Sequence, residues 1–296
     1  MRRLPLTSVV AAASVLALAG CARVPSPLMP ALRGSIGTPN SGVLLEGREL
    51  RRDAEGLRWL RDNDRHWAEP RFAQAIERAA AYVARERPGG RLTVGDLSTP
   101  TGGGPLPPHF SHRSGMDADL LFYATTLDGA PVDSPGFIHF GADGLARDEG
   151  HARFLRFDVD REWLLVRALL EDPEARVQWV FVSDVVHALL IEWALARGDS
   201  LDTIERADEV MRQPNPGGVH DDHIHVRTTC APDEMVEGCE PTGPQRRWIS
   251  YDVPRLDDRD EDLALSLAQP LAPSAPTAPA AVIARPLEAA HTNSRL

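Results

Sequence analysis

The segment VHDDHIHVR, residues 219–227, restricts the possible folds more than any other stretch, because it gathers three of the chain's ten histidines. On a β-strand alternate side chains point to the same face, so His223 and His225 would share one space while the intervening Ile and Val face a core. His220 lies just before this strand and can bend over the same spot. Three convergent imidazoles predict a transition-metal site, with zinc as the first candidate.

A catalytic zinc ion takes three protein ligands and keeps one position for water, so the fold must bring further ligands to this strand. Candidates lie a hundred residues earlier, in PPHFSHRSGMDADLLFY, residues 107–123. There Asp117 and Asp119 alternate with apolar residues, as on a strand with one polar face. His112 and Asp119 lie seven apart across the turn at Gly115, so the two side chains can meet at one point.

Three helices and four strands are predicted around these segments. One helix runs from Pro70 to the stop at Pro88, a second is capped by Asp160, and a third begins at Ser183 and ends at Gly198. Strand-like residues occupy Leu92–Val94, Met116–Tyr123, Val177–Val182 and His223–Thr228. Because the helices are grouped and do not alternate strictly with the strands, we expect an α+β domain, an antiparallel sheet with flanking helices.

Charge and composition exclude some classes of function. The net charge is −11, so a phosphate-binding surface is not indicated and no nucleic acid is expected as a partner. Every basic residue other than histidine is Arg, which rules out Schiff-base and P-loop lysine chemistry.

The first 21 residues predict export. Arg2 and Arg3 form a basic start, and the apolar run that follows is short for a membrane span, so residues 1–20 are predicted to be a signal peptide. The junction Leu-Ala-Gly-Cys at residues 18–21 resembles the bacterial lipobox, which implies that Cys21 is lipidated. Ala22 at the next position then fits delivery to the outer membrane, and the protein would be periplasmic and lipid-anchored. An ordinary secretory signal with an incidental cysteine is the alternative.

Composition also predicts the domain boundaries. Residues 21–42 are rich in Pro, Ser and Gly and are expected to be a flexible tether. Residues 43–262 show no internal repeat and are expected to form a single domain. Residues 263–296 are dominated by Ala and Pro and are expected to be a disordered tail.

The chain resembles the penicillin-insensitive murein endopeptidases, zinc peptidases of the LAS type grouped with lysostaphin, D-Ala-D-Ala dipeptidases and the hedgehog domain. The resemblance rests on an H-x6-D pattern followed far downstream by H-x-H, and on blocks that occur in the same order. These blocks are DNDRHWAEP, VGDLSTPTGGG, HFSHRSGMDADL, FDVDREWLLVRALL, VQWVFVS and HDDHIHVRTTC. It implies a LAS/hedgehog-like fold, a Zn²⁺ cofactor and peptidoglycan as the substrate.

The resemblance also implies a role for each site residue. His112, Asp119 and His225 would bind zinc, and His223 would take a proton from water. A protonated His220 would steady the charge on the carbonyl oxygen, and His109 matches a family position near the site. Asp117 is expected to support the ligands. With Cys21 assigned to the lipid, Cys230 and Cys239 remain. In an exported protein this pair predicts a disulfide, with two free or metal-binding thiols as the alternative.

Other polar residues of these segments are given structural roles. Asp221 and Asp222 are expected to be exposed or to orient an imidazole. Arg113 and Arg227 would bind substrate carboxylates or lie solvated at the surface. Four further histidines have no partner at ligand spacing and are expected to be structural: His139, His151, His187 and His291.

The leading hypothesis is therefore a zinc endopeptidase that cuts peptidoglycan cross-links at the D-alanyl to diaminopimelyl bond. Two alternatives remain open. One is a zinc D,D-dipeptidase or carboxypeptidase acting on uncross-linked stem peptides. The other is a catalytically silent lipoprotein that binds the cell wall.

Overall fold

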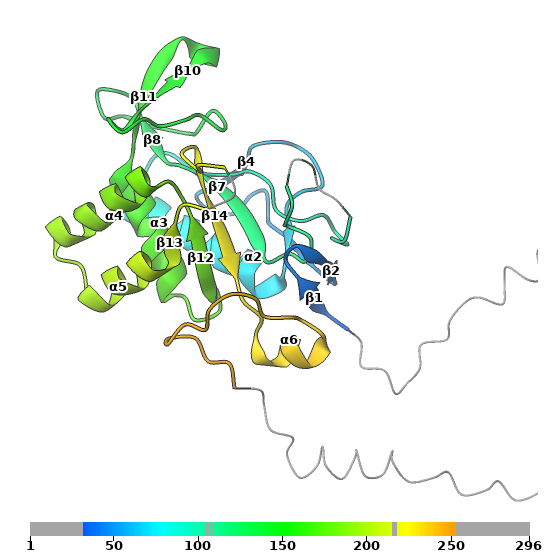
Figure 1. Cartoon of the computed structure of the whole chain (residues 1–296). Coiled ribbons are helices and arrows are strands. Elements are labelled where there is room, and N and C mark those ends of the chain that lie inside the picture. The colour runs from blue at the N-terminus through cyan, green and yellow to red at the C-terminus, as the bar shows by residue number, and fades with distance from the viewer. Residues whose placement is uncertain (1–31, 105–106, 108, 215–217, 253–296) are drawn as a thin grey trace, which may run out of the picture. The chain divides into compact units, whose positions relative to one another are not determined.

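Six strands form the main sheet, in the order β13-β12-β14-β7-β6-β4 (Figure 1). The computed structural model describes residues 32–104, 107, 109–214 and 218–252. The four inner strands pair antiparallel, whereas β13 runs parallel to β12 and β4 runs parallel to β6. Their bounds are β4 Leu57–Trp59, β6 Leu92–Val94, β7 Asp117–Leu121, β12 Val177–Phe181, β13 Met211–Arg212 and β14 His223–Thr228. The four predicted strands are confirmed, and they are the four neighbours at the centre of the sheet.

Alternation along β7 and β14 gives this sheet one apolar face and one polar face. Ala118, Leu120, Ile224 and Val226 are fully buried in the main apolar cluster. The residues between them, Asp117, Asp119, His223 and His225, therefore point to the opposite face. The register sets His225 opposite Asp119 across the two strands.

Helices pack on the apolar face of the sheet. They are α2 Pro70–Glu86, α3 Val159–Glu171, α4 Asp184–Arg197 and α5 Leu201–Val210, with the short α6 Pro232–Glu237 after the last strand. Buried residues of α2 to α5 join the strands in one cluster. This mixed arrangement of helices and sheets is compatible with the predicted α+β class.

The helix ends follow capping chemistry. In α4 the Ser183 side chain accepts the Val186 N–H and Gly198 closes the helix with φ 74°, as predicted. The predicted cap of α3 was wrong. Asp158, not Asp160, accepts the Arg161 N–H and begins that helix, while Asp160 lies in its first turn. Two acidic residues near one helix start compete for the cap, and the register of the preceding strand decides between them.

Short strands that were not predicted build three small sheets. β1 Gly34–Thr38 pairs with β2 Ser41–Leu45, and β3 Arg48–Glu49 pairs with β5 Trp67–Ala68. The third sheet has the order β10-β11-β8-β9, formed by Leu145–Asp148, Arg153–Phe157, Ala124–Thr125 and Pro131–Val132. The β10–β11 hairpin, whose turn holds the single-turn helix η1 Glu149–His151, extends away from the main sheet (Figure 1).

The expected start of the domain at Val43 is corrected by β1. Gly34–Thr38 lies inside the range 21–42 that composition assigned to the tether, yet it pairs along its whole length with β2. A short hairpin with glycines and a Pro-Asn turn has the same composition as a linker. Composition alone therefore cannot predict its strands. The predicted signal peptide, Cys21 and the tail 263–296 lie outside the described residues.

The predicted disulfide between Cys230 and Cys239 is confirmed. It closes the loop that carries α6, directly after β14. The Cys239 Sγ lies 3.7 Å from the Sδ of Met116, the residue that precedes β7. The cystine therefore packs near the start of β7 and the end of β14, the two strands that carry the polar face. Within the described part of the chain, none of the helices has the length and apolar character needed to cross a bilayer.

Candidate metal centre

Asp119 lies at the centre of a group of imidazoles on the polar face of the sheet. Its Oδ1 atom is 3.1 Å from His225 Nδ1, 3.4 Å from His112 Nε2 and 3.4 Å from His223 Nε2. Its Oδ2 atom is 3.6 Å from His109 Nδ1. The carboxylate itself is only 1% exposed. The structure thus brings together the three predicted metal ligands His112, Asp119 and His225 from the two distant segments.

Unsatisfied polar atoms in this group fit a bound cation. Both carboxylate oxygens of Asp119 and both ring nitrogens of His112 are buried without a hydrogen-bond partner among the residues described. Such atoms are costly unless something coordinates them. Ligand atoms of His109, His112 and Asp119 lie within 4.8 Å of one another, as do those of His220, His223 and His225. Imidazole nitrogens with one carboxylate oxygen are the donor set that zinc takes in catalytic sites.

Protonation states also suit metal binding. Burial lowers the pKa of His112 below its ordinary value, against the opposing charge of Asp119, so this imidazole favours the neutral form that a ligand requires. For Asp119, burial acts to raise the pKa, but the neighbouring imidazoles His112, His223 and His225 outweigh it and hold the pKa well below the usual range. The site therefore offers a neutral nitrogen beside an ionised carboxylate.

Asp117 orients the ligands from behind. Its Oδ1 atom is 2.9 Å from His225 Nε2 and 2.6 Å from Arg227 Nε, and its Oδ2 atom accepts the His112 backbone N–H at 3.0 Å. Since a carboxylate accepts only, His225 carries its proton on Nε2 and presents the lone pair of Nδ1 to Asp119. Asp117 thus lies where a supporting residue was expected. Arg227, weighed as a binder of substrate carboxylates, is engaged by Asp117.

Two site histidines have strained backbones. His112 has φ 65° and His220 has φ 55°, both in the left-handed region that side chains other than glycine rarely adopt. The hydrogen bond from His112 N–H to Asp117 holds the first in place. Strain of this kind persists where the surrounding structure over-determines a geometry, as it does at functional sites.

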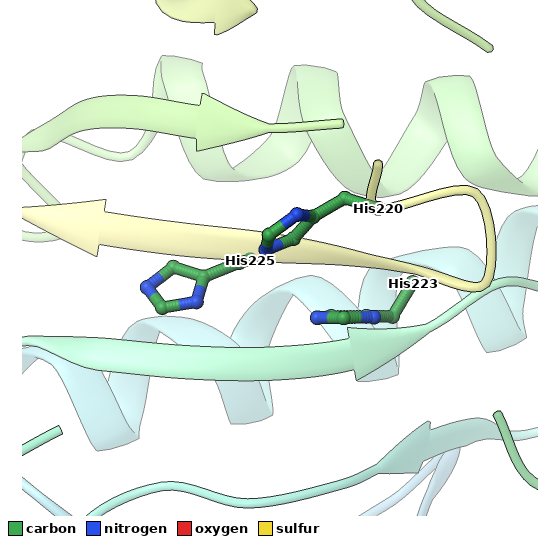
Figure 2. Close-up of side chains that lie close together, drawn as sticks. All are labelled: His220, His223 and His225. Carbon is green, nitrogen blue, oxygen red and sulfur yellow. The ribbon is translucent and has the colours of Figure 1, made fainter. Parts of the chain in front are cut away.

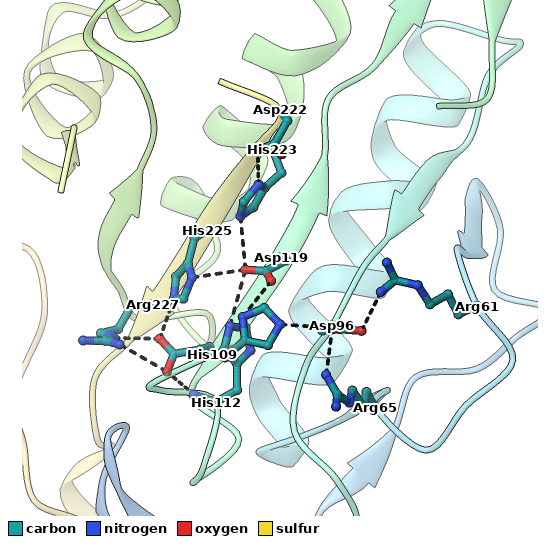
Figure 3. Close-up of polar contacts among 11 residues, drawn as sticks. Arg61, Arg65, Asp96, His109, His112, Asp119, Asp222, His223, His225 and Arg227 are labelled. Atoms are coloured by element: carbon teal, nitrogen blue, oxygen red, sulfur yellow. Dashed lines mark hydrogen bonds and ion pairs between the residues drawn. The ribbon is translucent and has the colours of Figure 1, made fainter. Parts of the chain in front are cut away.

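His223 points one nitrogen into the site and the other at a carboxylate (Figure 3). Nε2 faces Asp119, and Nδ1 is 2.6 Å from Asp222 Oδ1. Burial lowers the pKa of His223, but the neighbouring carboxylates Asp119 and Asp222 outweigh it and raise the pKa to about 9. Asp222 therefore has the orienting role that was one of its two expected roles.

His220 comes from the loop before β14 and lies over the other two histidines (Figure 2). Its ring centre is 4.8 Å from that of His223 and 5.8 Å from that of His225. Nδ1 donates to the carbonyl of Gly218 at 2.8 Å, and burial lowers the pKa of the ring. Nε2 therefore carries no proton in the favoured neutral form. The sequence predicted a protonated His220. The ring would take up this proton when negative charge develops beside it.

A second network supports the site from the side of β6, and of its members sequence reasoning had singled out only His109. His109 places Nδ1 near Asp119 and Nε2 at 3.0 Å from Asp96 Oδ2 (Figure 3). Asp96 is 3% exposed and also receives Arg65 at 3.1 Å and Arg61 at 3.4 Å. A carboxylate directly after a buried strand was the available signal for Asp96. Its partners lie 13 to 35 residues away, so no local pattern reveals them.

These residues line a cleft of about 710 Å³, a volume typical of ligand sites. Aromatic side chains form much of the rest of its wall: Phe110, Phe137 and Phe181. Arg113 is not among the lining residues. Three of the remaining histidines pair with carboxylates elsewhere, as His139–Asp221, His151–Asp148 and His187–Asp208. His291 lies outside the described residues.

The chain is similar in sequence to known proteins. A family model described as penicillin-insensitive murein endopeptidase matches residues 35–252. A penicillin-insensitive murein endopeptidase of Haemophilus influenzae is 28% identical over 229 residues, which cover 74% of this chain and 71% of that protein. Proteins of the same name from Salmonella typhimurium and Salmonella dublin are 26% identical over 219 residues, 73% of either chain. The family match runs from β1 to the last residue that the structure describes.

Proposed function

Because the chain belongs to the penicillin-insensitive murein endopeptidase family, we propose that it is a zinc endopeptidase that hydrolyses the peptide cross-links of peptidoglycan. The bond we assign to it joins a D-alanyl carbonyl to the side-chain amine of a diaminopimelyl residue. The observation that carries the proposal is Asp119, a buried carboxylate whose oxygens face four imidazoles at the base of a cleft. A LAS/hedgehog-like fold belongs to the same proposal.

His112, Asp119 and His225 would hold the zinc ion. When bound, zinc supplies Lewis acidity that makes water a nucleophile near neutral pH and polarises the scissile carbonyl. Asp117 keeps the proton of His225 on Nε2, and His112 is held by its backbone, so both ligands are oriented before the substrate arrives.

His223 moves the protons of the reaction. In its neutral form it keeps a proton on Nδ1, bonded to Asp222, and Nε2 accepts a proton from the attacking water. The water oxygen bonds to the carbonyl carbon, the amide C–N bond then breaks, and Nε2 returns the proton to the departing amine. Negative charge on the carbonyl oxygen favours a proton on His220 Nε2, which can then donate a hydrogen bond to it.

The proposal is tested with purified cross-linked muropeptide dimers. Zinc-loaded protein should convert dimers to monomers, lose this activity with a chelator, regain it with zinc, and be unaffected by penicillin because no serine is acylated. Uncross-linked pentapeptides offered in parallel separate an endopeptidase from a carboxypeptidase. Dimers that stay intact with metal-loaded protein contradict the assignment.

Replacing the proton carrier distinguishes an enzyme from a silent wall binder. His223→Ala should lower kcat by about 10²- to 10⁴-fold, since a positioned general base contributes that much, while bound zinc per chain stays unchanged. His187→Ala, on the far face at α4 and paired with Asp208, is the matched control and should keep full activity. Equal turnover of wild type and His223→Ala would refute the assigned role.

We also propose that the protein acts in the periplasm from a lipid anchor at Cys21. The support is the sequence of the export segment, a basic start and a short apolar run that ends in Leu-Ala-Gly-Cys. An anchored enzyme works on the wall next to the membrane that holds it, which agrees with peptidoglycan as the substrate.

A further inference from the structure

Arg61 extends into the cleft beside the metal centre with most of its hydrogen-bonding capacity unused. It follows β4, lines the cleft, and its side chain is 53% exposed. Its single hydrogen bond among the described residues is a long one, 3.4 Å from Nη1 to Asp96 Oδ1 (Figure 3). A guanidinium has five N–H donors in a planar fork, so at least four remain for a ligand.

The other arginines near the site are already engaged. Arg65 donates Nη1 both to Asp96 at 3.1 Å and to the carbonyl of Pro107 at 3.2 Å. Arg227 donates two nitrogens to Asp117 and is only 15% exposed. Arg61 is thus the arginine of the cleft lining whose guanidinium still has most of its N–H donors available to a ligand.

The charge around Arg61 favours an anion. The nearest carboxylate, Asp96, is compensated by Arg65 and also bonded by His109. With Asp96 balanced by Arg65, the positive charge of Arg61 is left over. A ligand carboxylate therefore meets a net positive site even though Asp96 lies beside it.

Arg61 also belongs to the wall that carries the proton-transfer residue. Its guanidinium lies 5.6 Å from the centre of the Phe137 ring, and Phe137 stands edge-on to His223 at 5.2 Å. On the other side, one carboxylate and one imidazole separate Arg61 from Asp119. An extended peptide advances about 3.5 Å per residue, so a group held by Arg61 belongs to a residue close to the scissile bond.

We propose that Arg61, backed by Phe137, is a carboxylate-binding subsite that recognises a free carboxylate of the substrate peptide close to the scissile bond. A guanidinium fork binds a carboxylate through two parallel hydrogen bonds between opposite charges. An amide is neutral, so it cannot supply the negative charge. The inference rests on the proposed function, since a diaminopimelyl residue at a cross-link keeps a free carboxylate on the side-chain carbon whose amine forms the scissile bond. The subsite would make the enzyme selective for cross-links whose diaminopimelyl carboxylate is not amidated.

The test compares two cross-linked dimers that differ only in a free carboxylate or a carboxamide at the diaminopimelyl residue. Zinc-loaded wild type should cleave the carboxylate form with a kcat/KM about 10- to 100-fold higher than the carboxamide form. Arg61→Ala should lose that preference by slowing only the carboxylate dimer, and Arg61→Lys should restore part of it. Arg52→Ala is the control, because Arg52 pairs with Asp62 outside the cleft lining.

Binding measured without turnover separates this inference from the proposed function. In the His223→Ala background, the carboxylate dimer should bind more tightly than the carboxamide dimer, and adding Arg61→Ala should remove the difference. Failure of the wild type to cleave either dimer would refute the proposed function but leave this comparison decisive. Equal affinities for the two dimers, or an Arg61→Ala effect of the same size on both, would overturn the subsite.

Discussion

At the scale of single residues, Asp117 links the metal ligands to the sheet. It is fully buried and bonds to the side chains of His225 and Arg227 and to the backbone of His112. Burial alone would raise its pKa, yet Arg227 and His225 outweigh burial and hold the pKa below the ordinary range. The carboxylate is therefore charged throughout the range in which the enzyme would act, and it stabilises the fold above the pKa of an unfolded aspartate.

Asp117→Asn tests this linkage. The amide loses the charge that faces Arg227 and can no longer accept all four hydrogen bonds, so zinc affinity should fall about 10- to 100-fold and the free energy of unfolding by about 2 kcal/mol. Competition with a chromophoric chelator and denaturant unfolding measure the two effects.

Asp148→Asn is the matched control for Asp117→Asn. Asp148 is also buried beside an arginine and a histidine, Arg153 and His151, but it lies on β10. It should lose stability without losing zinc affinity. A similar loss of affinity in both variants would show that Asp117 acts through general stability and does not orient the ligands.

At the scale of elements, the central strands could be predicted because alternation along β7 and β14 serves burial and chemistry together. The same alternation that buries Ile224 and Val226 aligns the histidines, so the pattern is strong in a single sequence. β1 and α5 were not predicted because their short segments bury few residues. Pairing with β2 stabilises β1, and packing on α3 stabilises α5, more than their own sequences do. Within the site, Asp96 and Arg61 are far apart in the sequence and meet only in the folded chain, so no local pattern predicts their contact.

The short helix α6 is joined to α2 by an ion pair. Its Glu234 side chain accepts the Ala231 N–H at 2.7 Å, and its Asp233 pairs with Arg71 of α2. Burial, and then the charge of Glu69, raise the pKa of Glu234 to about 8. In the unfolded chain the same carboxyl ionises near its ordinary value of 4.5. Unfolding therefore releases a proton between about pH 4.5 and pH 8, and this group's contribution to stability declines as pH rises through that window.

Glu234→Gln should remove this pH dependence. A glutamine keeps an oxygen for the Ala231 N–H and carries no charge, so the variant should be more stable than wild type at pH 8 by roughly 2 to 4 kcal/mol. The difference should shrink toward pH 5. Denaturant unfolding of both proteins across this range measures it, with Glu240→Gln, at an exposed position, as the control. Parallel stability profiles of wild type and Glu234→Gln would contradict the raised pKa of Glu234.

At the scale of the whole molecule, the first strand and the cystine loop hold each other. Gly37 N–H donates to Gly238 at 2.8 Å, and Glu240 N–H donates to Gly37 at 2.9 Å. The strand nearest to Cys21 in the sequence is therefore fastened to the loop that follows β14, the strand that carries His223 and His225. Only residues 22–33 separate Cys21 from β1, and a chain advances at most about 3.6 Å per residue. A lipid on Cys21 would thus keep β1 within roughly 50 Å of the membrane surface.

Replacing Cys21 decides whether the catalytic domain is anchored. Buried acyl chains contribute about 0.8 kcal/mol per methylene, so the wild type should sediment with membranes and need detergent for release, whereas Cys21→Ser should appear in the soluble periplasmic fraction with equal activity on muropeptide dimers. Ala22→Asp is the matched variant. It keeps the modified cysteine and should stay membrane-bound but leave the outer-membrane fraction, because the residue after the cysteine directs sorting in proteins with this signal. Identical fractionation of wild type and Cys21→Ser, with masses that differ only by the substitution itself, would instead establish a plain secretory signal.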